Sequence, residues 1–240
     1  ASFHTSLGAA DAINRLSAGE FSCAEHVQGL LERIQATEPA VQAWTTLDAA
    51  HVRQQAEAAD ERHAAGEPDG PLFGVPVGIK DIIDVAGLPT RLGLRSYRHY
   101  PQRSAKALTC LDSRIVLTSK VATTELNIAF GAGCRNPHYP SIDPSGSSTG
   151  SAVSVAAGLC DISLGTDVLG SVRWPASHCG MVGLRMTHKA GNLAGVFPLS
   201  PRMDALGWVA RSADDLDLLL PMLGIDGLLG EQLPLKQQYR

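Results

Sequence analysis

Closely spaced cysteines are absent from this sequence. Five cysteines are scattered over 240 residues, and none belongs to a Cys-x-x-Cys motif. They are Cys23, Cys110, Cys134, Cys160 and Cys179. An odd, dispersed set argues against a disulfide framework and against a zinc knuckle. It favours a reducing compartment, so we expect a cytoplasmic protein whose thiols are mostly buried and which holds no metal.

Basic runs and long apolar runs are also missing. No five consecutive residues are basic and the net charge is −4, which argues against nucleic acid as a partner, because binding phosphates needs clustered Lys and Arg. No apolar run is long enough to span a membrane, so no membrane association is expected. With 44% hydrophobic and 18% charged residues, the chain can form the core of one large domain or two small ones.

The first third of the sequence is predicted to be helical. Apolar residues recur at helical spacing from the candidate N-cap Ser22 up to Ile34, and Pro39 is expected to lie beyond the end of that helix. Residues 45–70 predict a second helix. It is polar on most faces, so much of its surface should be solvated.

After residue 70 the sequence alternates between short apolar stretches and helix-like segments. A helix of small residues is expected at 151–159, and another at 212–224 after the N-cap Ser212. Strands are predicted within 73–87, 112–120, 161–167 and 181–187. The alternation predicts an α/β fold with a sheet covered by helices, in which a helical region, 1–69, and a core, 70–240, together form one domain.

Two segments that combine glycines with serines stand out, and the first is rich in hydroxyls. The first, residues 145–158, reads "SGSSTGSAVSVAAG", so that hydroxyls and backbone N–H groups converge where a helix begins. Such an arrangement binds anions, although a serine-rich helix cap would read the same way. The second, residues 165–175, reads "GTDVLGSVRWP" and places the hydroxyl of Ser171 in a turn with two glycines.

The first segment also contains "GSSTG", which matches the Gly-x-Ser-x-Gly nucleophile elbow with Ser148 as the nucleophile. That motif needs a strand immediately before it. The preceding residues, 135–145, contain three prolines and are not expected to form one. His178 and His188 follow as candidate bases, but the elbow is the less favoured interpretation.

Lys80 follows the apolar run of residues 73–79. A lysine there can extend to the surface. If its amine is buried instead, its pKa falls and the neutral amine becomes a usable general base. No Ser-x-x-Lys sequence occurs, so any serine–lysine pair must be assembled from distant segments.

Taken together, these stretches resemble the amidase signature family, the Ser-cisSer-Lys amide hydrolases. The matching motifs are "GIKD", "PSGSSTGSA", "GTDVLGSVRWPA" and "CGMVGLRMT", and the similarity extends from about Leu7 to Leu220. The resemblance implies a mixed sheet covered by helices. Family members are much longer, so it also predicts a chain apparently truncated after the signature region. A fragment, a processed chain and a shortened divergent member are the alternatives.

The resemblance assigns the catalytic roles by position. It implies that Ser171 is the nucleophile, that Ser147 is a bridging serine after a cis peptide bond, and that Lys80 is the base. The three polar groups are then expected within hydrogen-bond reach of one another. The oxyanion hole would be formed by the backbone N–H groups of Val168, Leu169, Gly170 and Ser171. The supporting residues would be Thr166, Asp167, Ser148 and Arg173.

The function that follows from the resemblance is hydrolysis of a carboxylic amide through a serine acyl-enzyme, with a small-molecule amide as substrate and no cofactor. Two alternatives are kept: a non-catalytic amidase-like binding or assembly subunit, and an amidotransferase subunit that passes on ammonia. A homo-oligomer and a partner subunit both stay open.

Three residues depart from the glycines of the family pattern. Leu169 replaces a glycine next to the nucleophile, and a leucine would be strained there if the position has positive φ. Ser145 and Thr149 replace glycines in the serine-rich loop. We expect Thr149 to be the more disruptive of these two, because it is β-branched.

Overall fold

The computed structural model describes residues 7–67, 70, 72–109, 111, 116–128 and 131–219. Cys110 and the part of the predicted helix 212–224 beyond residue 219 lie outside the described residues. The other four cysteines are buried thiols, as expected. No helix in the described ranges combines the length and apolar character needed to cross a membrane.

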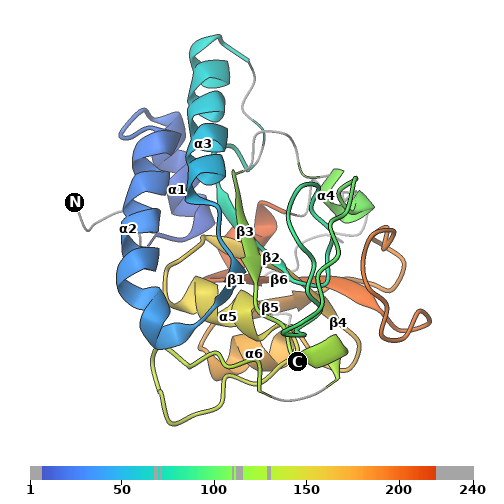
Figure 1. Ribbon diagram of the computed structural model, residues 1–240. Helices are drawn as coiled ribbons and strands as arrows, with labels where there is room; N and C mark the ends of the chain where they lie inside the picture. Colours follow the sequence, from blue (N-terminus) through green and yellow to red (C-terminus); the bar gives the residue numbers. More distant parts are fainter. Residues whose placement is uncertain are drawn as a thin grey trace, which may run out of the picture.

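A mixed sheet of six strands forms the centre of the described part of the chain (Figure 1). Its strands are β1 (Trp44–Thr46), β2 (Pro76–Lys80), β3 (Val116–Val121), β4 (Ile162–Asp167), β5 (Val182–Arg185) and β6 (Ala205–Ala210). Their spatial order is β1-β3-β2-β4-β6-β5. The central pairs β3–β2 and β2–β4 are parallel, while the outer pairs are antiparallel. The predicted α/β fold with a mixed sheet is confirmed.

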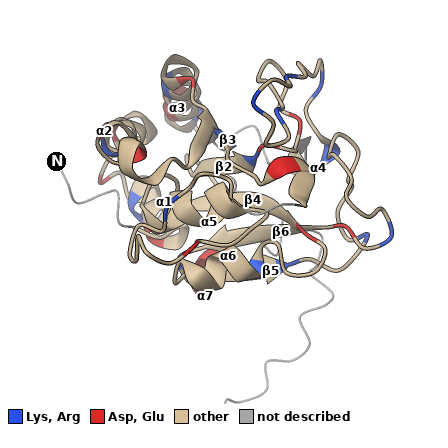
Figure 2. Cartoon of the chain, turned by 60° about the horizontal axis from the view of Figure 1, so that its bottom comes forward, with Lys and Arg blue, Asp and Glu red and all other residues tan. Residues whose placement is uncertain are grey.

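Helices pack around this sheet. They are α1 (Ala9–Ser17), α2 (Cys23–Val41), α3 (Ala49–Ala64), α4 (Lys106–Thr109), α5 (Thr149–Ala156), α6 (Arg173–His178) and α7 (Ala213–Asp217), with a 3-10 turn η1 (Glu125–Asn127). Figure 1 shows α2 and α3 side by side at one end of the sheet. Figure 2 shows Lys and Arg recurring on the loops beside α4, whereas the strands carry few charges.

The start of α2 is as predicted, but its end is not. Ser22 caps the helix in a reciprocal capping box with Glu25. Pro39, expected beyond the helix, lies inside its last turn, and the helix runs on to Val41. Proline lacks an N–H and so loses its own hydrogen bond at any interior position of a helix, but its fixed φ is compatible with helix, and α2 ends soon after it. Gln42 then ends α2 in a left-handed conformation, its N–H bonded to the Glu38 carbonyl.

Small residues let α5 lie directly on the sheet. Every residue of α5 is buried, and the helix contacts β2, β4 and β6. Gly150 needs its missing side chain, because a Cβ there would lie 2.3 Å from the Ala122 nitrogen and 2.7 Å from the Ala43 oxygen. The small residues of this predicted helix therefore allow its first turn, which follows the hydroxyl-rich loop, to pack directly against the backbone of neighbouring segments.

A buried ion pair joins α2 to the segment before β4. His26 Nε2 lies 2.9 Å from Asp161 Oδ2, both side chains are buried, and the imidazole stacks on Phe21. Burial opposes the charged imidazole. The Asp161 carboxylate and its hydrogen bond outweigh burial, so the pKa of His26 is raised above its ordinary value of 6.5. Folding therefore favours protonated His26.

We expect the free energy of unfolding to decrease as the pH rises above the ordinary histidine pKa. A group whose pKa is raised on folding stabilises fully below its unfolded-state pKa, and the stabilisation is lost as the pH passes the folded-state pKa. Urea unfolding at about pH 5.5 and about pH 8 measures this change, and His26→Gln should reduce it. Asp161→Asn should cost about 3–5 kcal/mol at the lower pH, because it breaks a buried pair. An equal pH dependence in wild type and His26→Gln would contradict the assignment.

Candidate active site

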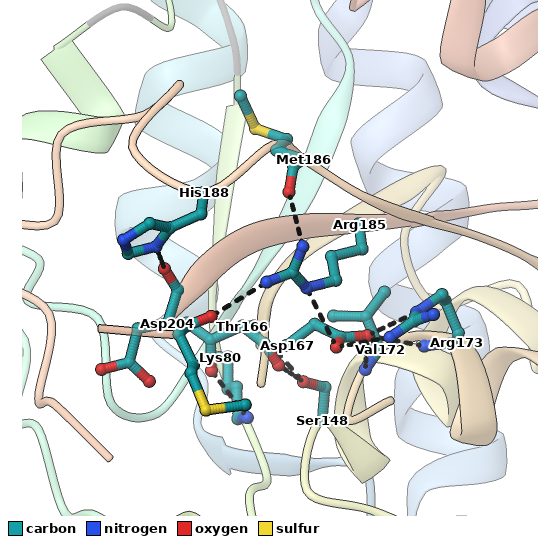
Figure 3. Close-up of polar contacts among 11 residues, drawn as sticks. Lys80, Ser148, Thr166, Asp167, Val172, Arg173, Arg185, Met186, His188 and Asp204 are labelled. Carbon is teal, nitrogen blue, oxygen red and sulfur yellow. Dashed lines mark hydrogen bonds and ion pairs between the residues drawn. The ribbon is translucent and has the colours of Figure 1, made fainter. Parts of the chain in front are cut away.

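Lys80 is the last residue of β2 and is completely buried. Its Nζ donates hydrogen bonds to Ser147 Oγ at 2.7 Å and to Thr166 Oγ1 at 3.0 Å, the latter drawn in Figure 3. Burial lowers the pKa of Lys80 from 10.5 to about 7, against the opposing charges of Asp167 and Asp204. A neutral amine is therefore accessible near neutral pH.

The next residue in the chain, Asp81, does not neutralise Lys80. Its carboxylate pairs with Lys120, whose Nζ lies 3.0 Å from Asp81 Oδ1, and both side chains are fully buried. Lys120 also donates to Thr90 Oγ1 at 3.0 Å. Adjacent residues at a strand end point to opposite sides. The fold thus gives one buried lysine a carboxylate in direct contact and leaves the other with two hydroxyls.

Ser147 and Ser148 occupy different environments. The Gly146–Ser147 peptide bond is cis, as the resemblance implies. Ser147 is buried, and its hydroxyl also donates to Asn127 Oδ1 at 3.3 Å. Ser148 is fully buried, and its hydroxyl donates to the Thr166 carbonyl at 3.1 Å. Of the two serines, only Ser147 contacts the lysine amine.

The arrangement around Ser148 does not support the nucleophile elbow. Residues 135–148 contain no strand. The Nδ1 atoms of the two candidate bases, His178 and His188, face the backbone carbonyls of Asp143 and Asp204 at 2.8 and 2.9 Å. Neither ring is bonded to the Ser148 hydroxyl, which is already committed to a carbonyl.

Ser171 lies in the turn between β4 and α6 and is partly exposed. Its carbonyl accepts a hydrogen bond from the Ser148 N–H at 3.0 Å, which fastens the turn to the serine-rich loop. Ser171 and Ser147 line the same cavity of about 250 Å³. In the described part of the chain, no hydrogen bond joins their two hydroxyls. The structure brings Lys80 and Ser147 into contact and places Ser171 at the same cavity.

The turn before Ser171 presents backbone donors that are not used within the protein. Within the described residues, the N–H groups of Val168, Leu169, Gly170 and Ser171 donate to no protein acceptor. Gly170 has a φ of +144°, which favours glycine. Unused backbone N–H groups are a requirement of an oxyanion hole, and Val168, Leu169 and Ser171 of this turn line the cavity.

Asp167 holds this turn in shape. Its carboxylate accepts hydrogen bonds from the Val172 N–H and from Nε and Nη2 of Arg173, and Arg185 lies 3.5 Å away (Figure 3). Burial opposes ionisation of Asp167, but the bonds from Arg173 and Val172 outweigh it and hold the pKa of the carboxyl below its usual value. The part of the chain described contains no group of three or more His, Cys, Asp or Glu side chains placed to bind a metal.

The amidase family model matches residues 25–233. The chain belongs to the amidase family. A glutamyl-tRNA(Gln) amidotransferase subunit from Roseiflexus sp. (strain RS-1) is 38% identical to it over 226 residues, which are 90% of this chain and 46% of that protein.

Solved structures give the same assignment. Native peptide amidase from Stenotrophomonas maltophilia aligns with a TM-score of 0.83 and 30% identity over 95% of this chain and 50% of that one. A chain from a vestigial protein complex, described as revealing the origins of an s-triazine catabolic enzyme, aligns with a TM-score of 0.86 and 30% identity. That match covers 90% of this chain and 50% of the other. This amidase-family chain spans about half the length of the relatives it matches.

The departures from the family's glycines have consequences that differ from those expected. Leu169 is not among the residues with positive φ, so the strain considered at this position is absent. Thr149, expected to be the more disruptive loop substitution, begins α5, and its Oγ1 donates to the Ser145 carbonyl at 2.7 Å. Ser145 has a φ of +65°. The backbone strain therefore falls on Ser145, and the expectation for Thr149 was wrong.

Sequence reasoning missed several residues at the site. Asn127, which lies next to Ser147, has a left-handed backbone and also accepts from Thr123 Oγ1. Trp174 and Leu199 line the cavity. Trp174 lies inside a quoted motif, but at a position where the family pattern admits any residue. No motif or periodicity marks Asn127, and Leu199 lies within the stretch of similarity to the family but outside the four motifs.

The two loop substitutions should affect stability in opposite directions. Ser145→Gly relieves a left-handed residue and should raise the free energy of unfolding by up to about 1 kcal/mol. Thr149→Val loses the Oγ1–carbonyl hydrogen bond and should lower it by about 1 kcal/mol. Urea denaturation of both variants against wild type measures the difference. A stabilising Thr149→Val would show that the threonine is tolerated rather than used.

Proposed function

We propose that this chain carries the acylation machinery of a carboxylic amide hydrolase, with Ser171 as nucleophile, Ser147 as bridge and Lys80 as base. The observation that carries the proposal is the buried Lys80 amine, bonded at 2.7 Å to a serine that lines the same cavity as Ser171. A serine hydroxyl needs an adjacent base to become a nucleophile, and a lysine held neutral by burial can serve as that base.

In the proposed reaction the Ser171 oxygen attacks the amide carbonyl. Its proton moves to Ser147 Oγ while the Ser147 proton moves to Lys80 Nζ. This step requires the Ser171 side chain to turn towards Ser147, since catalytic hydrogen bonds often form only when substrate is bound. The N–H groups of residues 168–171 would stabilise the negative charge on the former carbonyl oxygen.

Collapse of the tetrahedral intermediate completes acylation. The carbon–nitrogen bond breaks, and the proton held by Lys80 returns through Ser147 to the departing nitrogen. Water then attacks the acyl-enzyme, giving one proton to the same relay. The carboxylic acid leaves, and Ser171 regains its hydrogen. The step needs no redox partner and no cofactor.

One other enzymatic function has a specific observation in its favour. The Roseiflexus relative, a glutamyl-tRNA(Gln) amidotransferase subunit, matches 90% of this chain. In that case the released ammonia would pass to a partner subunit instead of being released into the solvent. The non-catalytic alternative drew on possible strain at Leu169 and on the short length of the chain. Leu169 does not have positive φ, so the first of these two supports is lost. The odd, scattered set of five cysteines supports a cytoplasmic location.

A fluorophosphonate probe tests the nucleophile. It should label Ser171 in the wild type, and Ser171→Ala should abolish labelling, as measured by mass spectrometry of the labelled peptide. Ser177→Ala is the matched control, because Ser177 is an exposed serine of the neighbouring helix α6, and it should label normally. Labelling of Ser148 in the wild type would contradict the assignment of Ser171.

The pH dependence tests the base. Protonated Lys80 cannot accept a proton, so the rate of labelling should rise with pH around a midpoint of about 7. Lys80→Met should slow labelling by about 10²- to 10⁴-fold and remove the midpoint. The exposed Lys106 provides a control variant, Lys106→Met, expected to keep the wild-type profile. A Lys80→Met protein that is folded and labels at the wild-type rate would exclude the relay.

A further inference from the structure

The outer part of the 250 Å³ cavity is bounded by four large apolar side chains, which we call the apolar wall: Ile128, Leu169, Trp174 and Leu199. All four are well exposed, with Leu169 at 67% and Trp174 at 52%. Exposed apolar side chains that gather around a cavity mark a contact surface for a ligand. Leu169 is also the residue that stands where the family pattern has glycine.

Trp174 is held in place by the turn that it covers. Its backbone N–H donates to the Gly170 carbonyl at 2.7 Å. A Cβ at Gly170 would lie 2.5 Å from Trp174 Cε2, so the indole lies directly against the glycine backbone. The ring therefore forms a fixed surface beside Ser171.

Leu199 is held by a buried carboxylate. Asp204 accepts hydrogen bonds from the N–H of Leu199 at 3.2 Å and from the N–H of Ser200 at 3.0 and 3.1 Å. These bonds fix the loop that carries Leu199 to the cavity. Asp204 is only 6% exposed, and its carboxylate is bonded to backbone N–H groups of its own loop.

Charge is missing from the cavity surface. The side chains that line it in the described residues include no Asp, Glu, Lys, Arg or His. A charged substrate group placed against the apolar wall would lose its hydration without gaining a partner. The volume of about 250 Å³ is also below the usual range of roughly 300–1,000 Å³ for ligand pockets, which favours a small ligand.

We propose that the apolar wall selects small, uncharged amides with an apolar substituent, and that Leu169 is the main specificity-determining residue. The inference rests on the proposed function, since it concerns the substrate of the same Ser171 site. Leu169 adds apolar surface next to the nucleophile, whereas a glycine there would leave the mouth of the cavity open to polar groups.

Two primary amides of similar size test the inference in the full chain. Benzamide has an uncharged apolar substituent, and succinamate, the monoamide of succinic acid, has a carboxylate. Wild-type kcat/KM should be at least about tenfold higher for benzamide. Leu169→Lys should lower that ratio by about tenfold or more, mainly through a higher KM for benzamide and a lower KM for succinamate. Leu47→Lys, an equally non-conservative change at an exposed leucine outside this cavity, should leave the ratio unchanged.

Protection of Ser171 from the fluorophosphonate gives a second readout that needs binding but no turnover. Benzamide should protect the wild type at concentrations at least about tenfold lower than succinamate. A preference for succinamate, or the same ratio in wild type and Leu169→Lys, would overturn the inference while labelled Ser171 leaves the proposed function standing. If the probe does not label Ser171 at all, the proposed function fails and this inference fails with it.

Discussion

The desolvation of Lys80 is the constraint around which the site is built. An ammonium group loses a large hydration energy on burial, and only a partner or the loss of its proton compensates. Within the described residues Lys80 contacts two hydroxyls, those of Ser147 and Thr166, and no carboxylate. Its pKa of about 7 follows from this arrangement. Had Lys80 taken the carboxylate that Lys120 holds, that negative charge would oppose the effect of burial and favour the protonated amine, which cannot act as a base.

The surrounding contacts preserve that environment. Thr166 and Asp167 are consecutive in β4, and the strand directs the hydroxyl towards Lys80 while the carboxylate meets Arg173 and Arg185 (Figure 3). Asp167 therefore influences Lys80 only at a distance, where its charge opposes the effect of burial without cancelling it. One short strand end thus supplies both the hydroxyl contact of the base and the anchor of the nucleophile's turn.

Much of this could be predicted from the sequence, and the missing parts have physical reasons. The capping residues Ser22 and Ser212, the small-residue helix and the strands around Lys80 and Asp167 follow from local patterns. β1 and β6 were not predicted. β1 has only three residues, and a fully buried run such as β6 cannot be told from a buried helix segment by periodicity alone, although β2 and β4 of the same kind were recognised.

In the candidate site, too, some residues could be predicted from the sequence and others could not. The resemblance to the amidase signature family brought Lys80, Ser147 and Ser171 together as candidates, since their segments match its motifs in order. It could not identify Asn127, whose position next to Ser147 depends on a left-handed residue in the 3-10 turn η1. It also placed the strain at Thr149 and Leu169. Side-chain shape alone does not give backbone φ, and the structure puts the left-handed residues at Ser145 and Gly170.

Gly170 links chemistry to specificity. It has positive φ and lies in the 168–171 segment, whose N–H groups donate to no protein acceptor within the described residues, as the proposed oxyanion hole requires. Its missing side chain admits the Trp174 ring, which forms one side of the cavity. The backbone that would stabilise the transition state and two of the four side chains of the apolar wall, Leu169 and Trp174, therefore belong to one short segment. A change in the wall at Leu169 can alter substrate choice while leaving the donors in place, because the donors belong to the backbone and the selecting surface belongs to the side chains.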